Sequence, residues 1–157
     1  IVRRVPLRGR WCRVAAEHFA IAADVHCWLR HIPPEAYRCE TPDGRGVSRR
    51  EAAARIARTV CADLEMLSPR DITRIARHVA RAQRARIVAA IRQVLSRLST
   101  VAPRVALATG AGAFLARDAA AAAGLDAIDL AATLEPAAAR ALPAAAVAWL
   151  LAEEEGR

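Results

Sequence analysis

Acidic side chains beside apolar segments are the first candidates for chemistry in this sequence. Asp24 lies in an apolar segment just before Val25, where burial of a carboxylate without a partner is costly, so it either caps a helix or faces a site. Glu40, Asp43 and Arg45 share a turn that either orients an anionic or amine-bearing substrate or is an ordinary charged turn. We take Asp24 and Asp43 as candidate catalytic residues, and Glu40 and Arg45 as candidate substrate-binding residues.

A glycine turn is the second candidate site. Residues 105–109 form a short apolar run typical of a buried strand, and a helix is predicted from the following glycines to about residue 123. Backbone N–H groups at such a turn suit a phosphate or carboxylate, which makes Thr109, Gly110 and Gly112 candidate substrate-binding residues. Close packing of the helix on the strand would explain the same glycines. The third glycine of a dinucleotide fingerprint and the Gly-Lys-Ser/Thr of a P-loop are both missing.

The histidines and cysteines do not have the spacing of a metal site. Structural zinc sites use close pairs of ligands from tight turns, so we predict no metal site and no Ser/His/Asp or Cys/His nucleophile. The sequence shows no secretory segment, which favours reduced thiols and a cytoplasmic location. Its longest apolar run, residues 141–152, is shorter than the ~20 residues of a membrane helix. The residues considered for zinc are Cys12, His18, His26, Cys27, His31 and Cys39.

The formal net charge of +8 comes from arginine alone, since the sequence contains no lysine. Five arginines recur along one face of a predicted helix, and this face is either solvated or binds a phosphate, a substrate or an acidic partner. Aromatic residues make up only 4% of the chain, which argues against a nucleic-acid groove. The five are Arg70, Arg74, Arg77, Arg81 and Arg84.

The pattern of apolar residues predicts a helix-dominated α/β chain. A helix of about three turns starts near Ala20, and Ser48 three residues before Glu51 is a capping box that opens a helix over 48–67. Ser68 and the proline that follows it predict the start of a helix that continues to about residue 98. The apolar face of this helix rotates near Gln83, so the helix either kinks there or packs its two halves on different partners. A second strand is predicted over 124–130, and further helices from Glu135 and over 142–152.

Several stretches, taken in order, resemble hydantoinase/oxoprolinase-like proteins of the tetrahydromethanopterin-linked one-carbon pathway. They are residues 16–26 (AEHFAIAADVH), 40–46 (ETPDGRG), 58–63 (RTVCAD), 108–116 (ATGAGAFLA) and 142–151 (LPAAAVAWLL). The resemblance implies the carboxy-terminal portion of an actin-like ATPase (ribonuclease H-like) superfold with a helical insertion. It also implies a cytoplasmic transferase of methanofuran biosynthesis that joins an aminomethylfuran unit to a tyramine-glutamate unit.

The same resemblance sets expectations for the organisation of the chain. Residues 1–157 would form one carboxy-terminal region of a two-lobed protein, in segments 1–46, 47–100 and 101–157. The missing amino-terminal lobe would supply any Mg²⁺ or nucleotide site, so the full-length protein is expected to be an enzyme and this chain alone inactive. The expected partners are a small-molecule substrate and that lobe or a second copy, with no membrane. The alternatives are a noncatalytic Arg-rich binding module and a truncated, inactive remnant.

Position by position, Asp24 matches the acid of the family's Ala-Asp-Val, and the glycine turn at 110–112 matches its second glycine turn. Asp43 and Arg45 match its polar loop. The sequence departs from the family pattern in three places, since threonine-like residues are expected at Ile21 and Ala22, a glycine at Arg30, and a lysine at Val47.

Overall fold

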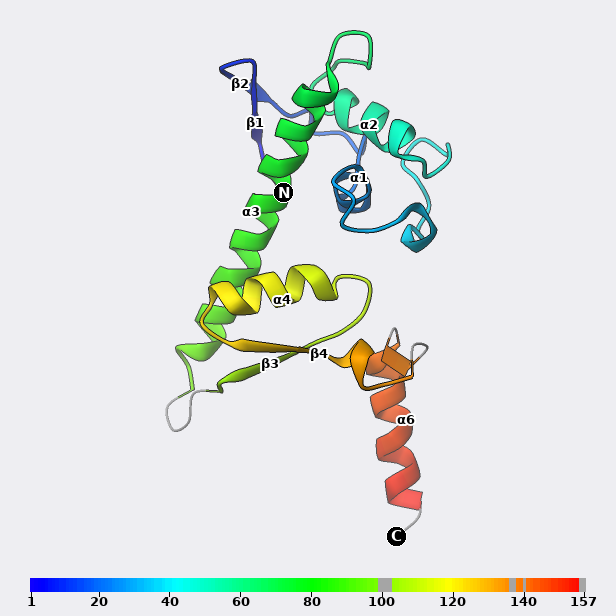
Figure 1. The fold of residues 1–157 in the computed structure, drawn as a ribbon, viewed down its shortest axis with the longest axis vertical. Coiled ribbons are helices and arrows are strands. Elements are labelled where there is room, and N and C mark those ends of the chain that lie inside the picture. Colours follow the sequence, from blue (N-terminus) through cyan, green and yellow to red (C-terminus); the bar gives the residue numbers. More distant parts are fainter. Residues whose placement is uncertain (99–102, 136–137, 140, 156–157) are drawn as a thin grey trace. The chain divides into compact units, whose positions relative to one another are not determined.

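The computed structural model describes residues 1–98, 103–135, 138–139 and 141–155 and divides into two compact units, Ile1–Gln83 and Arg84–Arg157. Helices outnumber strands in both, which confirms the mixed α/β, helix-dominated class (Figure 1). The boundary between the units, at residues 83 and 84, lies within one helix. The segment boundary predicted from the sequence, near residue 100, lies outside the described residues. The segment boundaries expected from the sequence stay predictions.

The first unit opens with a hairpin of β1 (Arg4–Leu7) and β2 (Arg10–Arg13), which pair antiparallel. Arg8 and Gly9 form its two-residue turn with φ of 47° and 77°, the left-handed geometry that matches the twist of a tight hairpin. The hairpin was not predicted from the sequence, because Arg-Gly is a weaker turn signal than Asn-Gly.

Three α-helices and one 3₁₀ helix follow, and the last of them, α3, continues into the second unit. α1 (Ala22–Trp28) is shorter than the three turns expected from Ala20, and the short 3₁₀ helix η1 (Pro34–Ala36) follows it. α2 (Arg49–Arg58) begins at the predicted capping box, with Ser48 as N-cap. α3 (Pro69–Leu95) begins after Ser68, whose hydroxyl accepts from the N–H of Asp71 at 3.2 Å.

The prediction of one helix over 48–67 is wrong beyond Arg58. Thr59 turns its hydroxyl onto the carbonyl of Ile56, and Cys61 adopts a left-handed φ of 55°, which stops the helix. Asp63 then accepts hydrogen bonds from two following N–H groups and forms a local turn.

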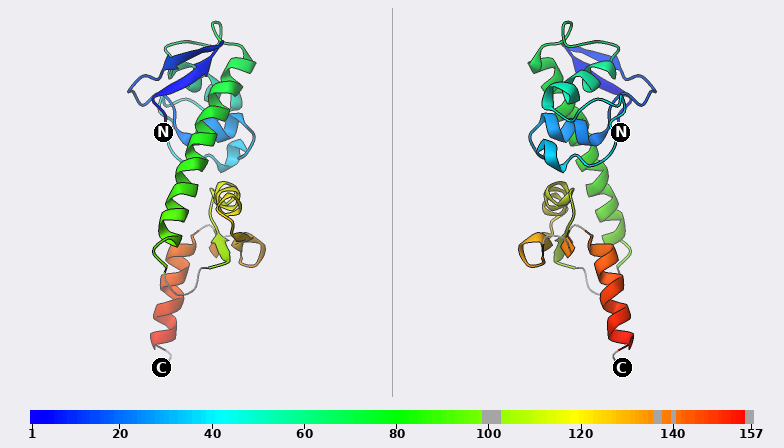
Figure 2. Two further views of the ribbon diagram at one scale, coloured as in Figure 1. Left: turned by 90° about the vertical axis from the view of Figure 1, so that its left-hand side faces the viewer. Right: turned by 90° about the vertical axis from the view of Figure 1, so that its right-hand side faces the viewer.

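The core of the first unit lies between α1, α2 and the amino-terminal part of α3. Ile56, Ile72 and Ile75 are almost fully buried there, as the helical spacing predicted. The hairpin lies beside the same part of α3, where Arg8 bonds to Asp71 and Trp11 packs edge-on against His78 (Figure 2). The remaining members of this core are Val5, Val25, Ala53, Ala57, Leu67 and Ala76.

The second unit contains a strand, helix, strand motif. The order of β3 (Val105–Ala108), α4 (Ala113–Ala122) and β4 (Asp126–Asp129) is as predicted from the sequence. The structure adds that the two strands pair in parallel and that α4 packs on both. The 3₁₀ helix η2 (Leu130–Ala132) and α6 (Leu142–Glu155) follow. The helix expected from Glu135 lies partly outside the described residues. Arg84 and Arg92 of α3 donate to carbonyls of Asp118 and Ala122, so the two halves of α3 have different partners, one of the two outcomes predicted.

The prediction that residues 105–109 form a buried strand is wrong for the described residues. Only Ala108 is buried, while Leu107 is 64% exposed and Val105 and Ile128 are each 45% exposed. Exposure alternates along both strands, because α4 covers one face of the pair and nothing described covers the other.

Among the described residues, no helix is both long enough and apolar enough to cross a membrane.

Candidate functional site

A buried ion pair between α1 and α2 is the main polar feature of the first unit. Arg55 donates from Nε to Asp24 Oδ1 at 2.7 Å, and both side chains are 0% exposed. Arg55 lies within α2 between buried alanines and Ile56, so the helix that forms the core also carries the cation into it. Burial of either charge alone would cost several kcal/mol, on the order given for an ion in a protein interior.

Asp24 has each oxygen occupied by protein donors. Its Oδ2 accepts from the N–H of Ile21 at 2.9 Å, the reach-back contact of a helix N-terminus. Its Oδ1 accepts from the Tyr37 hydroxyl at 3.1 Å in addition to Arg55. Asp24 therefore caps α1 and also belongs to a buried polar cluster, and its part in a functional site stays a prediction.

Asp43 joins the cluster from the loop between η1 and α2. Its Oδ1 accepts from Arg55 Nη1 at 3.0 Å and its Oδ2 from Arg58 Nη1 at 3.1 Å. Arg55 Nη1 also donates to the carbonyl of Gly46 at 3.1 Å. One guanidinium thus ties Asp24 to Asp43 and fixes both ends of the loop at 43–46 to α2. We call Asp24, Tyr37, Asp43, Arg55 and Arg58 the Arg55 cluster.

The electrostatics of the Arg55 cluster favour its charged form. Burial works to lower the pKa of Arg55, but the hydrogen bond and charge of Asp24 outweigh it and raise that pKa. Burial likewise works to raise the pKa of Asp43, yet the N–H of Arg45 and the guanidinium of Arg55 hold it below its usual value. Burial and the adjacent Asp24 carboxylate raise the pKa of Tyr37, so its hydroxyl remains a donor.

Arg55 retains one unused donor. Its Nη2 is the only buried side-chain nitrogen or oxygen in the described ranges that lacks a hydrogen-bond partner. A buried guanidinium normally uses its donors fully, since an unpaired polar group in a protein interior is costly. Both N–H donors of Nη2 are therefore left without an acceptor inside the cluster.

The other two candidates of the polar loop point their side chains to solvent. Glu40 and Arg45 are exposed, and neither forms an ion pair within the parts of the chain that the structure describes. The backbone of Arg45 is nevertheless held, because its N–H donates to Asp43 at 3.3 Å and its carbonyl accepts from Thr41. The loop that Asp43 anchors thus carries two exposed charges of opposite sign, Glu40 and Arg45, outside the Arg55 cluster.

Thr109, Gly110 and Gly112 belong to the second unit. Gly110 has φ of +79°, a conformation that favours glycine, and Gly112 is the N-cap of α4. The Thr109 hydroxyl donates to the carbonyl of Ala139, so it is already used. The part of these residues in binding a substrate stays a prediction.

Sequence reasoning missed Arg55, Arg58 and Tyr37. A signal was present, because Asp24 in an apolar segment requires a partner, and Arg55 is flanked by the apolar positions of the helix predicted over 48–67. The spacing of 31 residues between the partners carries no local pattern, so the pairing itself was not predictable.

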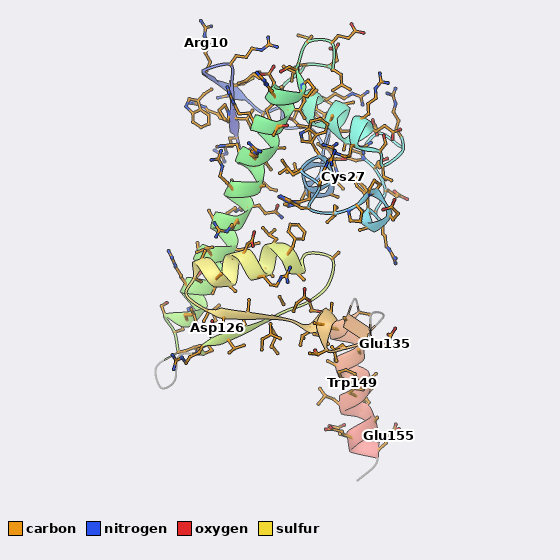
Figure 3. The ribbon with its side chains drawn as sticks, viewed as in Figure 1. Arg10, Cys27, Asp126, Glu135, Trp149 and Glu155 are labelled. Atoms are coloured by element: carbon orange, nitrogen blue, oxygen red, sulfur yellow. The ribbon has the colours of Figure 1, made fainter. Side chains whose placement is uncertain are left out.

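Within the described ranges, His, Cys, Asp and Glu side chains do not gather in groups of three that could hold a metal ion. The free cysteines Cys12, Cys39 and Cys61 have at least partial exposure, whereas Cys27 is buried on α1, where the side chains of the first unit crowd together in Figure 3.

Comparison with known proteins gives matches over most of the chain. The model of the hydantoinase/oxoprolinase family matches residues 8–154. The sequence is 37% identical over 67 residues, 43% of the chain, to the (4-{4-[2-(gamma-L-glutamylamino)ethyl]phenoxymethyl}furan-2-yl)methanamine synthase of Methanocaldococcus jannaschii, of which 20% is covered. A protein of that name from Methanococcus vannielii is 36% identical over 63 residues, covering 40% of this chain and 28% of that protein. The chain thus spans well under a third of these relatives' lengths.

Proposed function

The chain belongs to the hydantoinase/oxoprolinase family, and from this membership we propose that it is part of a methanofuran-pathway synthase that joins an aminomethylfuran unit to a tyramine-glutamate unit. The similarity to two synthases of one name is the observation that carries the proposal. The product named for these synthases contains a phenoxymethyl group, in which a phenol oxygen is bonded to the methylene carbon of a furan.

Formation of that ether bond sets the requirements for the protein. The phenol oxygen bonds to the furan methylene carbon, the phenol proton goes to a base, and the group that activates the methylene leaves with its electron pair. The product also carries a primary amine at one end and a glutamyl carboxylate at the other. A site for both units needs an anion for the ammonium and a cation for the carboxylate.

The polar loop supplies side chains of both kinds. We assign Glu40 to the ammonium of the furan unit and Arg45 to the glutamyl carboxylate, since both are exposed and without ion pairs in the described residues. Asp43, held by Arg55 and Arg58, fixes the loop. Asp24 is fully buried, so its proposed part is to hold Arg55 in place and to complete the candidate catalytic pair with Asp43.

The second unit, considered by itself, offers an anion site. Residues 109–112 place backbone N–H groups at the start of α4, and such donors favour a phosphate or a carboxylate. We assign Thr109, Gly110 and Gly112 to this anion site. The wider architecture proposed is the carboxy-terminal portion of an actin-like ATPase superfold with a helical insertion, with Mg²⁺ or a nucleotide bound, where required, by the amino-terminal lobe.

The proposed partner is that lobe or a second copy of the chain. The bare face of β3 and β4 supports a partner of this kind, since parallel strands are normally covered on both faces. Analytical ultracentrifugation of the purified chain separates the two cases. A dimer supports the second copy, and a monomer at high concentration favours the lobe.

The proposal is tested with the gene product isolated from its own cells. It is incubated with gamma-L-glutamyltyramine and an activated aminomethylfuran, and the ether product is followed by mass spectrometry. We expect Arg45→Gln to weaken use of the glutamyl substrate at least about tenfold, as loss of a charge-assisted hydrogen bond does, while Arg50→Gln leaves it unchanged. Absence of the ether product with the intact native protein, together with an unchanged content of the carrier in a deletion strain, would refute the synthase.

The exposed arginines of α3 support a second function, a noncatalytic module for an acidic partner. All five arginines of the predicted stripe are exposed. Binding of a generic anionic polymer that falls steeply with added salt would support this function, and no binding at low salt would remove it.

A further inference from the structure

A pocket of about 300 Å³ lies at the end of α1 in the first unit, apart from the Arg55 cluster. This volume is at the lower end of the range for small-molecule sites, roughly 300–1,000 Å³. Most of the residues that line it are apolar, and its two charged residues are arginines. The residues that line it are Cys27, Arg30, Ile32, Pro33, Pro34 and Arg49.

Arg30 reaches the pocket from an unusual backbone conformation. Its φ is +62°, the left-handed geometry that follows a helix end and is usually given to glycine. The conformation is held by backbone bonds, since the Arg30 N–H donates to Cys27 and the His31 N–H to His26. A residue with a side chain is therefore strained here, and its side chain has no ion pair among the described residues.

Arg49 is the fixed cation of the pocket. It is the first residue of α2, and its guanidinium donates from Nε and Nη2 to the carbonyl of Trp28 at 3.3 and 2.9 Å. The same group lies over the Trp28 ring, 4.7 Å from its centre. These contacts orient the guanidinium before any ligand arrives, which lowers the ordering cost of binding.

The lining itself contains no carboxylate, and Asp24 and Glu35 are the carboxylates whose charges reach Cys27. Cys27 donates its thiol hydrogen to the carbonyl of Val47, and burial together with Asp24 raises its pKa, so the thiol stays neutral. Ile32, Pro33 and Pro34 are the other apolar residues of the lining. The combination of two cations with an apolar wall matches an anionic group attached to an apolar body.

We propose that this pocket binds a small organic oxyanion, a carboxylate or a phosphate ester with an apolar body, and that Arg30 and Arg49 hold its oxygens. This site is independent of the proposed synthase activity, because it rests only on the pocket and its lining. Arg30 is the residue that selects for an anion in this pocket. A glycine at this position would relieve the strain of the left-handed backbone but would remove one of the two cations.

The test is a titration of the ¹⁵N-labelled full chain with benzoate, phenyl phosphate and the neutral benzamide, followed by two-dimensional NMR. We expect saturable shifts of the Arg30, Ile32 and Arg49 amides with at least one of the two anions and none with benzamide. Saturation with benzoate alone identifies a carboxylate ligand, and saturation with phenyl phosphate alone identifies a phosphate. Arg30→Gln is expected to weaken the anion at least about tenfold, whereas the neighbouring exposed Arg50→Gln leaves its affinity unchanged.

Arg30→Gly separates binding from folding. We expect its melting temperature to equal or exceed that of the native chain while anion affinity falls as in Arg30→Gln. The proposal is overturned if neither anion gives saturable shifts, if benzamide binds as well as benzoate, or if both Arg30 variants bind the anion with native affinity.

Discussion

Removal of the Arg55 guanidinium is the most direct test of the buried cluster. In Arg55→Met the side chain keeps a similar length, but Asp24 loses its cation while remaining 0% exposed. Asp24 then retains only the Tyr37 hydroxyl and the Ile21 N–H as donors. Asp43 keeps Arg58, so most of the cost falls on Asp24.

The expected loss in the free energy of unfolding is about 3–5 kcal/mol, the range for breaking a buried ion pair by removing one partner. Arg58→Met is the matched control, because Arg58 contacts the same Asp43 but is 38% exposed. Its expected cost is at most about 1 kcal/mol, as for exposed pairs. The difference between these two variants therefore measures burial, since both lose an arginine of α2 that binds Asp43.

The assay is urea unfolding followed by tryptophan fluorescence in a Trp149→Phe background, which leaves Trp11 and Trp28 as reporters of the first unit. Adding Asp24→Asn to Arg55→Met should recover part of the loss, because the buried charge is then removed. The reasoning is refuted if Arg55→Met costs no more than Arg58→Met, or if the added Asp24→Asn recovers nothing.

Three further predictions concern single groups of the first unit. Ser48→Ala removes the N-cap acceptor of Glu51 N–H, so the free energy of unfolding should fall by about 1 kcal/mol in urea titrations, with the exposed Ser96→Ala as a control that should be neutral. Burial lowers the pKa of His26 in the folded chain. The free energy of unfolding should therefore be at its maximum above about pH 6.5 and should decline as the pH falls through the lowered pKa of the folded state. His26→Asn should flatten that decline, whereas the control variant of an exposed histidine, His18→Asn, should not. Tyr37 is the single tyrosine, and burial raises its pKa, so near-ultraviolet absorbance should show no ionisation at about pH 10 in the folded chain; stability should fall as pH rises above that value, and ionisation there without unfolding would contradict the Asp24 contact.

Local sequence signals predicted the helices and strands. They could not predict which residues far apart in the sequence contact one another. Capping residues at Ser48 and Ser68 located two helix starts, because the side-chain oxygen and the N–H it accepts from lie three residues apart. The end of α2 was missed, since it depends on a left-handed Cys61 that no residue-type rule predicts. A helix start can be predicted from residues that are close in the sequence. The end of α2, in contrast, depends on how the chain turns toward α3.

The candidate site divides in the same way. Asp24 and Asp43 were selected by their sequence surroundings, and the structure joins them through Arg55. An acidic residue in an apolar segment indicates that a buried partner must exist. Which residue is that partner depends on how the helices pack and cannot be predicted from the local sequence. Arg30 was noted only as a departure from a family pattern, and its meaning required the φ angle and the pocket.

The strand pair of the second unit extends this argument to the larger protein. Continuous apolar residues over 105–109 predicted burial on both faces, yet Leu107 is 64% exposed and α4 covers one face only. Parallel strands are stable when layers cover both faces, and a pair alone is marginal in water. If a second layer covers this face in the proposed enzyme, Leu107→Lys should disrupt assembly and leave the βα unit folded, because Leu107 contributes little to the core of the described chain. A Leu107→Lys protein that assembles and forms product as well as the native one would show that the face stays open and that the apolar run serves the strand pair alone.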